Sequence, residues 1–505
     1  MLVKAYGSAV CGIEAITVTI EANVSNGINF YLVGLPDSAV RESQQRISTA
    51  VEAVGLRIPC KRIVINMAPA DIRKEGSAYD LPLALAVLAA SEQIQAPMLG
   101  TTLCMGELAL DGTVRPVRGA LSMALHARDC GIKACILPLE SAREACVVDG
   151  IDVYGVTHLA QVLDLVEGFG EEPALKPDLS QNDGLLQADY PDFAQVRGQA
   201  QARRALEVAA AGGHNVLMSG PPGAGKTFMA RCLPGILPPL TQAEAVETTR
   251  IWSVAGLPRS EAGLMRSRPF RSPHHTASVV SLTGGGASAL PGEISLAHNG
   301  VLYLDELPEF PGRALEVLRQ PLEDGTIQLS RVRYKVSYPA RFMLVASMNP
   351  CPCGYRDHPS RECICTEYQV QRYRNRISGP LLDRIDIQLQ VKPVEVDDLI
   401  PERTGVFGES SAVIRRRVEK AREIQRERFS HFEGIHTNAH IKVDQLPRYC
   451  SLQKESRLFM KQAMRRLDLS ARAYHRILRL ARTIADLEGS AAIEIQHLAE
   501  AIQYR

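Results

Sequence analysis

A glycine-rich segment at residues 220–227 has the residue types and the spacing that phosphate chemistry requires. It reads GPPGAGKT, follows an apolar run at 215–218 and precedes a segment with helical character. In a strand–loop–helix unit, the glycines let backbone N–H groups approach and surround phosphates. The ammonium group of Lys226 would neutralise the β- and γ-phosphates, and the hydroxyl of Thr227 would ligate Mg²⁺. The segment predicts a site for ATP and Mg²⁺ built from Gly220, Pro221, Pro222, Gly223, Ala224, Gly225, Lys226 and Thr227.

Polar residues follow two further apolar runs. Asp305 and Glu306 end the run 300–304, and Asn349 follows the run 342–347. At the carboxyl edge of a parallel sheet, Asp305 would hold Mg²⁺, Glu306 would orient the attacking water and Asn349 would hydrogen-bond the γ-phosphate. Taken alone, the acidic pair could begin a helix and the asparagine could form a turn. Their position downstream of a phosphate-binding loop favours ATP hydrolysis.

Four cysteines form two C-x-C pairs separated by nine residues: Cys351, Cys353, Cys363 and Cys365. Four thiolates complete a closed tetrahedral Zn²⁺ site, which would be structural because no coordination position stays open. His358 lies between the pairs and could replace one thiolate. The spacing is tighter than the common C-x₂-C, and the alternatives are four unliganded thiols or two disulfides. A reducing cytosol favours zinc over disulfides.

Residues 325–342 alternate in hydrophobicity as the arms of a β-hairpin do. The predicted tip is rich in cations and carries an aromatic side chain. In a ring of subunits, such tips could follow phosphates and stack on a base. The alternative is a solvated hairpin whose charges prevent edge-to-edge association. The predicted DNA contacts are Arg331, Arg333, Tyr334 and Lys335.

The elements that must position these residues follow from the pattern of apolar runs. Between residues 193 and 394, short apolar strands alternate with helices, which predicts a parallel α/β sheet that carries the hairpin and the cysteine-rich insertion. Residues 395–505 are rich in Arg, Glu, Ala and Leu at helical spacing, and residues 1–168 mix strands with helices. Residues 169–192 are polar and contain proline, as linkers do. We therefore expect an α+β domain, a linker, an α/β P-loop core and an α-helical lid.

The bulk composition excludes several classes of protein. The 505 residues carry 57 basic and 56 acidic side chains, so a nucleic-acid partner would need a local basic patch. No run reaches about 18 uninterrupted apolar residues, and the first residues lack the apolar core of a signal peptide. We therefore expect a soluble, cytoplasmic protein with no membrane partner.

Several long motifs are shared with one family. The strings GPPGAGKT, YLDE, GPLLDRID, RSPHHTAS, NPCPCGY and SARAYHRILRLARTIADL resemble those of magnesium-chelatase-like AAA+ ATPases of the ComM/YifB type, over essentially the whole chain. The resemblance implies an AAA+ core with a helical lid, in which Asn349 is sensor 1. It implies that Arg384 is an arginine finger that reaches a neighbouring subunit of a hexamer, and that Arg472 is sensor 2. Without the resemblance, both arginines would be interpreted as surface ion pairs.

The resemblance also implies a function and partners. A protein of the ComM type would be a hexameric, ATP-driven DNA motor that promotes branch migration, with helicase activity, while DNA integrates during natural transformation. Its partners would be single-stranded and branched DNA, with a recombinase or other recombination proteins. The alternative is a chelatase-type chaperone ATPase that remodels a protein partner. The string RSPHHT at 271–276 receives no role, because adjacent histidines diverge in a strand or helix and would not ligate one metal.

The N-terminal region resembles the Lon protease domain in the strings KEGSAYDLPLALAVLAAS and GELALDGTVRPVRGALSMALHARDCGIKACILP. Where that family has its nucleophilic serine, this chain has Ala78, and where the family has the partner lysine, it has Leu121. Ser77 lies one position away, without an evident base. Nucleophilic catalysis needs an activated hydroxyl within reach of a base. We therefore expect an ATP hydrolase that is not a protease, with a degenerate Lon-like domain.

Overall fold

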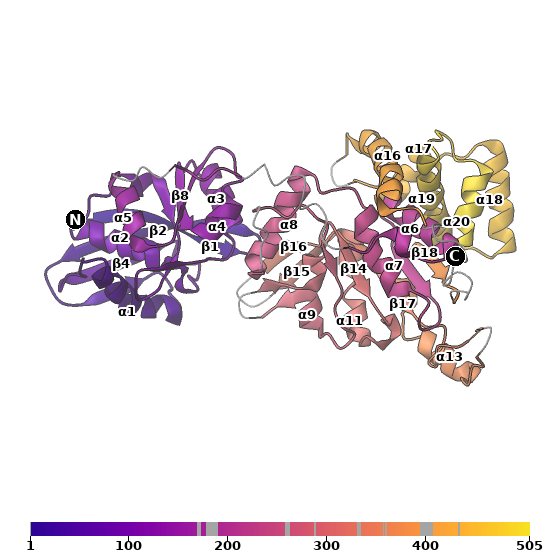
Figure 1. Ribbon diagram of the computed structural model, residues 1–505, viewed down its shortest axis with the longest axis horizontal. Coiled ribbons are helices and arrows are strands. Elements are labelled where there is room, and N and C mark those ends of the chain that lie inside the picture. Colours follow the sequence, from indigo (N-terminus) through magenta and orange to yellow (C-terminus); the bar gives the residue numbers. More distant parts are fainter. Residues whose placement is uncertain are drawn as a thin grey trace. The chain divides into compact units, whose positions relative to one another are not determined.

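The computed structural model describes residues 2–168, 173–177, 190–257, 263–286, 289–330, 335–356, 358, 361–393, 408–432 and 435–505. The chain forms two compact units (Figure 1). The first unit combines Met1–Gly184 with Gln242–Met265, and the second combines Leu185–Thr241 with Arg266–Arg505.

The segment Gln242–Met265 lies within the predicted 193–394 core in sequence, yet it groups with the first unit. Its helix α8 (Gln242–Ala255) makes specific hydrogen bonds there. The Ser253 hydroxyl donates to the Glu144 carboxylate over 2.6 Å, and the Arg250 guanidinium donates to the Ile13 carbonyl over 2.7 Å. These polar contacts join residues more than a hundred positions apart, which no local sequence pattern can indicate.

The first unit is built on a seven-stranded sheet with the order β3-β4-β2-β1-β5-β8-β9. Its strands β1, β2 and β4 pair antiparallel, whereas the other pairs in the sheet are parallel. The helix α2 is buried along its whole length, as expected of a helix that is apolar on every side. This mixed sheet with helices fits the predicted α+β domain. The elements are β1 (Leu2–Cys11), β2 (Glu14–Ser25), β3 (Phe30–Val33), α1 (Ser38–Ala53), β4 (Arg62–Ala68), α2 (Asp80–Ala90), β5 (Thr102–Cys104), α3 (Ala120–Asp129), β8 (Ala134–Pro138), α4 (Leu139–Ala145), β9 (Asp152–Val156) and α5 (Leu159–Glu167).

The second unit is built on a five-stranded sheet with the order β11-β14-β17-β10-β18, in which every pair is parallel. The predicted α/β fold with a parallel sheet is confirmed. The order inserts β17 between β10, which precedes the glycine-rich loop, and β14, which precedes the two acidic residues. The strands are β10 (Val216–Ser219), β11 (Phe270–Arg271), β14 (Val301–Leu304), β17 (Met343–Met348) and β18 (Ile387–Gln390).

Side chains of the central strands alternate between two cores, one on each face of the sheet. In β17, for example, Val345 belongs to the core with the C-terminal helices and Leu344 to the core on the opposite face. Burial on both faces explains why these strands are continuous apolar runs. The helices α16, α18, α19 and α20 form the predicted helical lid, coloured orange to yellow in Figure 1. The larger helices of this unit are α6 (Ala200–Gly212), α7 (Lys226–Cys232), α13 (Glu367–Arg374), α16 (Ser411–Phe429), α18 (Lys454–Arg466), α19 (Ala471–Leu487) and α20 (Ile495–Gln503).

Candidate active site

The carboxyl edge of the parallel sheet brings together the residues that the sequence predicts for ATP hydrolysis. In the register of the sheet, Ser219 of β10 lies beside Met348 of β17, and Leu304 of β14 lies beside Ala346. The residues that follow these strands therefore meet at one edge, where ligands bind in open α/β sheets. The Gly220 N–H donates to the Met348 carbonyl over 3.2 Å, which fixes the start of the glycine-rich loop against β17.

Lys226 begins α7 directly after Gly225, which has a left-handed φ of 84°. Its ammonium group donates to the carbonyl of Gly220 over 2.6 Å and to the Oδ1 of Asn349 over 3.3 Å. The residue is buried, and burial lowers the pKa of the ammonium group. The structure thus brings together the predicted phosphate-binding cation and the predicted γ-phosphate sensor, although they are 123 positions apart.

Asp305 receives several hydrogen bonds. Thr227 donates from its hydroxyl to Oδ2 over 2.9 Å, and Ser347 donates to Oδ1. Burial alone would raise the pKa of Asp305, but the bonds from Ser347, Thr227 and Tyr303 outweigh it and hold the pKa below its usual value. A carboxylate next to a hydroxyl is the kind of oxygen pair that holds Mg²⁺ together with phosphates. The donor set therefore fits the predicted Mg²⁺ ligands.

Ser347 contacts the candidate Mg²⁺ ligand Asp305, although no sequence pattern indicated it. It is fully buried in β17 and donates to Asp305, so Ser347→Ala should reduce Mg²⁺ affinity or ATP turnover by about 10-fold or more. A Mg²⁺ titration of ATP hydrolysis measures this loss. The matched control is Ser295→Ala, since Ser295 is equally buried and its hydroxyl has no hydrogen-bond partner among the described residues. Unchanged Mg²⁺ dependence in the first variant would contradict the assigned role.

Glu306 is held in an uncommon backbone conformation, with a φ of 53°. Its N–H donates to Asp305 Oδ1 over 3.0 Å and to Ser347 Oγ over 3.3 Å. Its carbonyl accepts from the Glu309 N–H over 2.8 Å. A left-handed conformation in a non-glycine residue costs free energy and persists where its surroundings fix it, which happens often at functional sites. The half-exposed carboxylate is thus directed by the backbone next to Asp305.

His275 faces the carboxylate of Glu306, although no role was predicted for residues 271–276. Its Nδ1 lies 3.5 Å from the Glu306 Oε2. The ring packs edge-on against Phe310, with centroids 6.5 Å apart. The expectation that the two histidines diverge is wrong, because the ring centroids of His274 and His275 are 4.1 Å apart. They still face different partners, since His274 Nδ1 lies 2.9 Å from the Thr276 hydroxyl.

The two predicted arginines lie together, but not at the glycine-rich loop. Arg384 and Arg472 both line a cavity of about 740 Å³ in the second unit. Arg384 lies three residues before β18, which begins at Ile387, and its carbonyl accepts from the Asn215 side chain over 2.8 Å. Asn215 precedes β10, and the glycine-rich loop follows that strand. Arg384 therefore lies at the amino-terminal ends of the parallel strands, opposite the carboxyl ends where the loop lies. A four-residue strand spans about 13 Å.

Both arginines make ion pairs, as expected from the alternative interpretation that they form only surface ion pairs. Arg384 contacts Glu323, and Arg472 pairs with Asp383 over 2.7 Å while its side chain remains 73% exposed. Arg476 binds the other oxygen of Asp383 over 2.9 Å and is itself buried. Arg476 was not predicted, although it lies one helical turn after Arg472 on the same face of α19.

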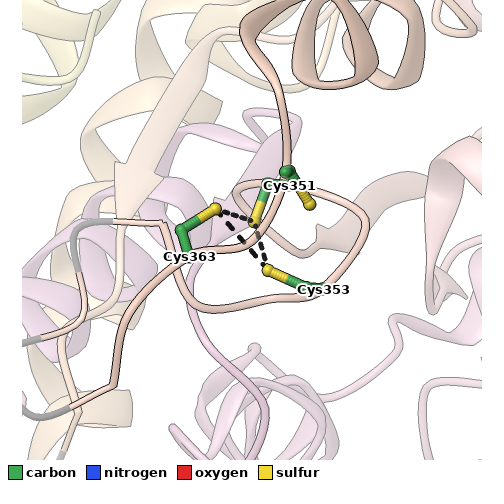
Figure 2. Close-up of side chains that lie close together, drawn as sticks. Cys351, Cys353 and Cys363 are labelled. Atoms are coloured by element: carbon green, nitrogen blue, oxygen red, sulfur yellow. Dashed lines mark hydrogen bonds between the residues drawn. The ribbon is translucent and has the colours of Figure 1, made fainter.

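The four predicted zinc ligands converge. Figure 2 shows the thiols of Cys351, Cys353 and Cys363 pointing toward one another. The Sγ of Cys351 lies 3.3 Å from that of Cys353 and 3.5 Å from that of Cys363, and those of Cys353 and Cys363 are 3.6 Å apart. With Cys365, all four Sγ atoms lie within 4.8 Å of one another. A tetrahedral site with Zn–S bonds of about 2.3 Å places its sulfur atoms about 3.8 Å apart. The four thiols are therefore spaced as a zinc site requires.

The cysteines form no disulfides in the structure, so that alternative receives no support. The Tyr355 N–H hydrogen-bonds the sulfur of Cys353 and lowers the pKa of this thiol, whereas desolvation and the neighbouring thiols raise the pKa of Cys363 and of Cys365. Cys353 is therefore the first of these three thiols to form the thiolate that binds metals. Among the described residues, this cluster is the one group of His, Cys, Asp and Glu side chains whose ligand atoms converge closely enough for a metal ion.

Family models match most of the chain. The model for magnesium chelatase, subunit ChlI, matches residues 192–399, a second ChlI model matches 20–141, and the ChlI C-terminal model matches 408–505. The chain is 44% identical over 499 residues to uncharacterized protein YifB of Escherichia coli K12, covering 98% of this chain and 96% of YifB. It is 43% identical over 504 residues to competence protein ComM of Haemophilus influenzae, covering 99% and 96%. The chain belongs to the magnesium-chelatase-like family of the ComM/YifB type. This finding confirms the resemblance and places the chain among AAA+ ATPases.

The hairpin that the sequence predicts for residues 325–342 of this ComM/YifB-type chain is present. β15 (Thr326–Ser330) pairs antiparallel with β16 (Lys335–Pro339), and Ile327 lies opposite Tyr338. The predicted DNA contacts Arg331, Arg333 and Tyr334 lie outside the described residues, as does the side chain of Lys335. Their role stays a prediction. Across the described part of the chain, no helix has both the length and the apolar character needed to cross a bilayer.

A Lon protease is a weaker relative of the chain. Lon protease 2 of Bacillus subtilis is 27% identical over 128 residues, which is 25% of this chain and 23% of that protein. Leu121, at the position of the Lon lysine, is a fully buried apolar residue of α3. Ser77, for which no base was evident, hydrogen-bonds to the carboxylate of Glu107. The pair that Lon proteases use remains replaced by Ala78 and Leu121, and the absence of protease activity stays a prediction.

Proposed function

We propose that this protein is an ATP-driven DNA motor that works as a hexamer and promotes branch migration, with helicase activity, during the integration of DNA by homologous recombination. The observation that carries the proposal is the arrangement at the two ends of the parallel strands of the AAA+ sheet. At the carboxyl ends, Lys226 contacts Asn349 and Thr227 contacts Asp305. At the amino ends, Arg384 and Arg472 line one cavity. The name of the relative ComM, a competence protein, supports transformation as the setting.

The chemistry at the carboxyl ends of the strands is hydrolysis of the γ-phosphate of ATP. Backbone N–H groups of the glycine-rich loop and the ammonium group of Lys226 would bind the phosphates. Thr227 and Asp305 would hold Mg²⁺, which supplies charge neutralisation between the β- and γ-phosphates. Glu306 would orient and polarise the attacking water, and Asn349 would contact the γ-phosphate. The hydrogen bonds to Asp305 keep it ionised for this role.

The chemistry at the amino ends of the strands requires another copy of the chain. Arg384 lies about one strand length from the glycine-rich loop of its own subunit, so its guanidinium would act on a nucleotide bound by a neighbour. Arg472, paired to Asp383 next to it, would join the same intersubunit site. A site divided in this way favours a closed ring.

DNA contact is proposed for the tip of the β15–β16 hairpin. The triple variant Arg331→Glu, Arg333→Glu and Lys335→Glu should bind single-stranded DNA more weakly and lose DNA-stimulated ATPase, with DNA-free ATPase retained. Loss of three phosphate contacts should reduce the slope of log K against log salt by about 2 to 3. Fluorescence anisotropy at several salt concentrations measures both effects.

The charge-matched control for the hairpin variant lies on α18. The triple variant Lys461→Glu, Arg465→Glu and Arg466→Glu changes three exposed cations of that helix and should leave DNA affinity nearly unchanged. Equal DNA affinity in the hairpin variant and the wild type would contradict the proposed DNA surface.

The second candidate function, a chaperone ATPase that remodels a protein, is favoured by the magnesium chelatase models that match most of the chain. Three-strand and Holliday-junction migration assays separate the two functions. ATP-dependent migration supports the DNA motor, and a recombinase would then be a natural partner to add. ATPase activity that ignores every DNA structure would instead support the chaperone.

We also propose that the four cysteines bind a structural Zn²⁺. The Sγ spacing and the complete set of four ligands support a closed site. Metal analysis of the purified protein tests the proposal, with Cys351→Ser and Cys363→Ser as variants that should lose the metal. Less than about one zinc per ten chains in protein purified without chelators would overturn it.

A further inference from the structure

The cysteine-rich segment touches the phosphate-binding loop at Gly354. This residue follows Cys353 and has a left-handed φ of 84°. A Cβ built on Gly354 would lie 2.7 Å from Cδ and 2.9 Å from Cγ of Pro222, in the middle of the GPPGAGKT loop. The same Cβ would lie 3.9 Å from the Cγ of Asn349. The Gly354 backbone therefore packs directly on the loop, and no larger residue fits there without displacing Pro222.

The thiol cluster determines where this contact lies. The Gly354 N–H donates to the Cys351 carbonyl over 3.0 Å, and the Arg356 N–H donates to the Cys351 sulfur over 3.3 Å. Cys351 is fully buried and lies two positions after Asn349. The turn that presents Gly354 is thus wrapped around one sulfur of the cluster, next to the residue that Lys226 contacts.

The arms of the cluster come from separate parts of the segment. Cys351 and Cys353 lie just after β17, while Cys363 and Cys365 lie just before α13. A bound metal would join the two arms and remove most of the conformational freedom of the turn between them. Zn²⁺ would bind as the four thiols release their protons, so that four Zn–S bonds form. Without such a link, the position of Gly354 depends on a few backbone hydrogen bonds.

We propose that the Cys₄ centre is a metal-dependent brace for the nucleotide site: zinc bound by Cys351, Cys353, Cys363 and Cys365 holds Gly354 against Pro222 and keeps the phosphate-binding loop and Asn349 in the geometry that binds ATP. Affinity for ATP therefore depends on metal occupancy, although no cysteine contacts the nucleotide. This inference rests on the proposed ATP and zinc sites and goes beyond both, because it couples them.

The first experiment compares nucleotide affinity in zinc-loaded and zinc-free protein. Full-length protein is stripped with a chelator, the chelator is removed, and Mg²⁺ is restored before titration with a fluorescent ATP analogue. We expect zinc-free protein to bind the analogue about 10-fold more weakly or worse, and added Zn²⁺ to restore the affinity. Far-UV circular dichroism should show that the helices of the chain are retained.

The second experiment changes the contact between Gly354 and Pro222 without removing any of the four cysteine ligands. Gly354→Ala should keep its zinc and weaken binding of the ATP analogue about 10-fold, because its Cβ pushes on Pro222. The control is Gly489→Ala, since Gly489 has a similar left-handed φ of 70° but an added Cβ meets nothing within 4 Å. It should bind the analogue as the wild type does. In the double variant Gly354→Ala, Pro222→Ala the atoms that clash are gone, so Gly354→Ala should cost less affinity in a Pro222→Ala background than in the wild type.

The outcomes separate this inference from the functions on which it rests. Zinc-bound protein whose nucleotide affinity is unchanged by zinc removal and by Gly354→Ala would overturn the brace and leave the ATPase and the zinc site standing. If protein purified without chelators contains no zinc and still binds ATP normally, both the proposed metal centre and the proposed brace are overturned. Wild-type protein that binds zinc but no nucleotide would contradict the proposed ATPase function itself, and the brace with it.

Discussion

Replacing Arg384 by alanine is expected to lower ATP hydrolysis by about 10³-fold and to leave ATP binding nearly unchanged. The reason is its position three residues before the start of β18, whereas the glycine-rich loop follows the end of the neighbouring parallel strand β10. Arg384 makes no contact with Lys226 or Asp305, so its loss should not disturb the phosphate-binding residues of the same subunit. Its guanidinium would serve only the site of the next subunit. Turnover assays and titration with a fluorescent ATP analogue measure the two effects separately.

A mixing experiment shows whether Arg384 acts on a neighbour. Arg384→Ala subunits retain Glu306, and Glu306→Gln subunits retain Arg384, so about one interface in four of randomly mixed rings joins an intact base to an intact finger. A one-to-one mixture should recover about a quarter of the wild-type rate if interfaces act independently, whereas each variant alone is inactive. No recovery in the mixture would contradict action between subunits.

A matched control shows that the loss is specific to this arginine. Arg426 pairs with Glu423 over 3.8 Å on the exposed face of α16. Such surface pairs contribute between about 0 and 1 kcal/mol, so Arg426→Ala should keep wild-type turnover. If Arg384→Ala behaved like Arg426→Ala, the simple surface ion pair with Glu323 would be the better interpretation.

Much of the candidate site could be predicted from sequence because its parts are local or follow a topological rule. The glycine-rich loop is one continuous string, and its strand–loop–helix context is visible in the chain itself. Asp305 and Asn349 each end an apolar run, and parallel strands place their carboxyl ends at one edge. The order of the strands then made their contacts with Thr227 and Lys226 an expected result.

The residues that were missed depend on contacts between distant segments. Ser347 is one apolar-strand residue among several, and only the register of β17 beside β14 reveals that it faces Asp305. His275 follows β11, a strand of two residues, which is too short for a period-2 pattern to show. Gly354 lies in a cysteine-rich string whose fit against Pro222 no spacing rule contains. Tertiary packing decides these positions, and local preference does not.

The same limit explains the grouping of Gln242–Met265 with the first unit. The segment has an ordinary helical pattern, and its polar contacts reach Glu144 and Ile13, which lie far away in the chain. Domain boundaries inferred from changes in composition cannot show that a helix within one domain's sequence packs with the other domain. The role of Arg476 is easier to infer from the sequence, because it lies one helical turn after the predicted Arg472 on the same face of α19. Both arginines bind Asp383.

Glu306→Gln is expected to lower kcat for ATP hydrolysis by about 10²- to 10⁴-fold, the range that a general base contributes. Glutamine has nearly the same shape, and the backbone bonds from Glu306 to Asp305 and Ser347 do not involve the side chain. The left-handed turn and the phosphate-binding residues should therefore remain in place, and the affinity for ATP should stay within about threefold of the wild type. Single-turnover hydrolysis and analogue binding measure the two quantities.

The control for this variant lies three residues further along the chain. Glu309 is also partly exposed and pairs with Arg376 over 2.7 Å, outside the group of residues around Asp305. Glu309→Gln also removes one negative charge, only three residues from Glu306. If a change in the local electrostatic potential caused the loss of turnover, both variants would lose it. If only Glu306→Gln loses turnover, the effect belongs to the carboxylate that His275 faces. Turnover within about threefold of the wild type in Glu306→Gln would show that another residue activates the water, and the strained backbone at Glu306 would then need a purely structural explanation.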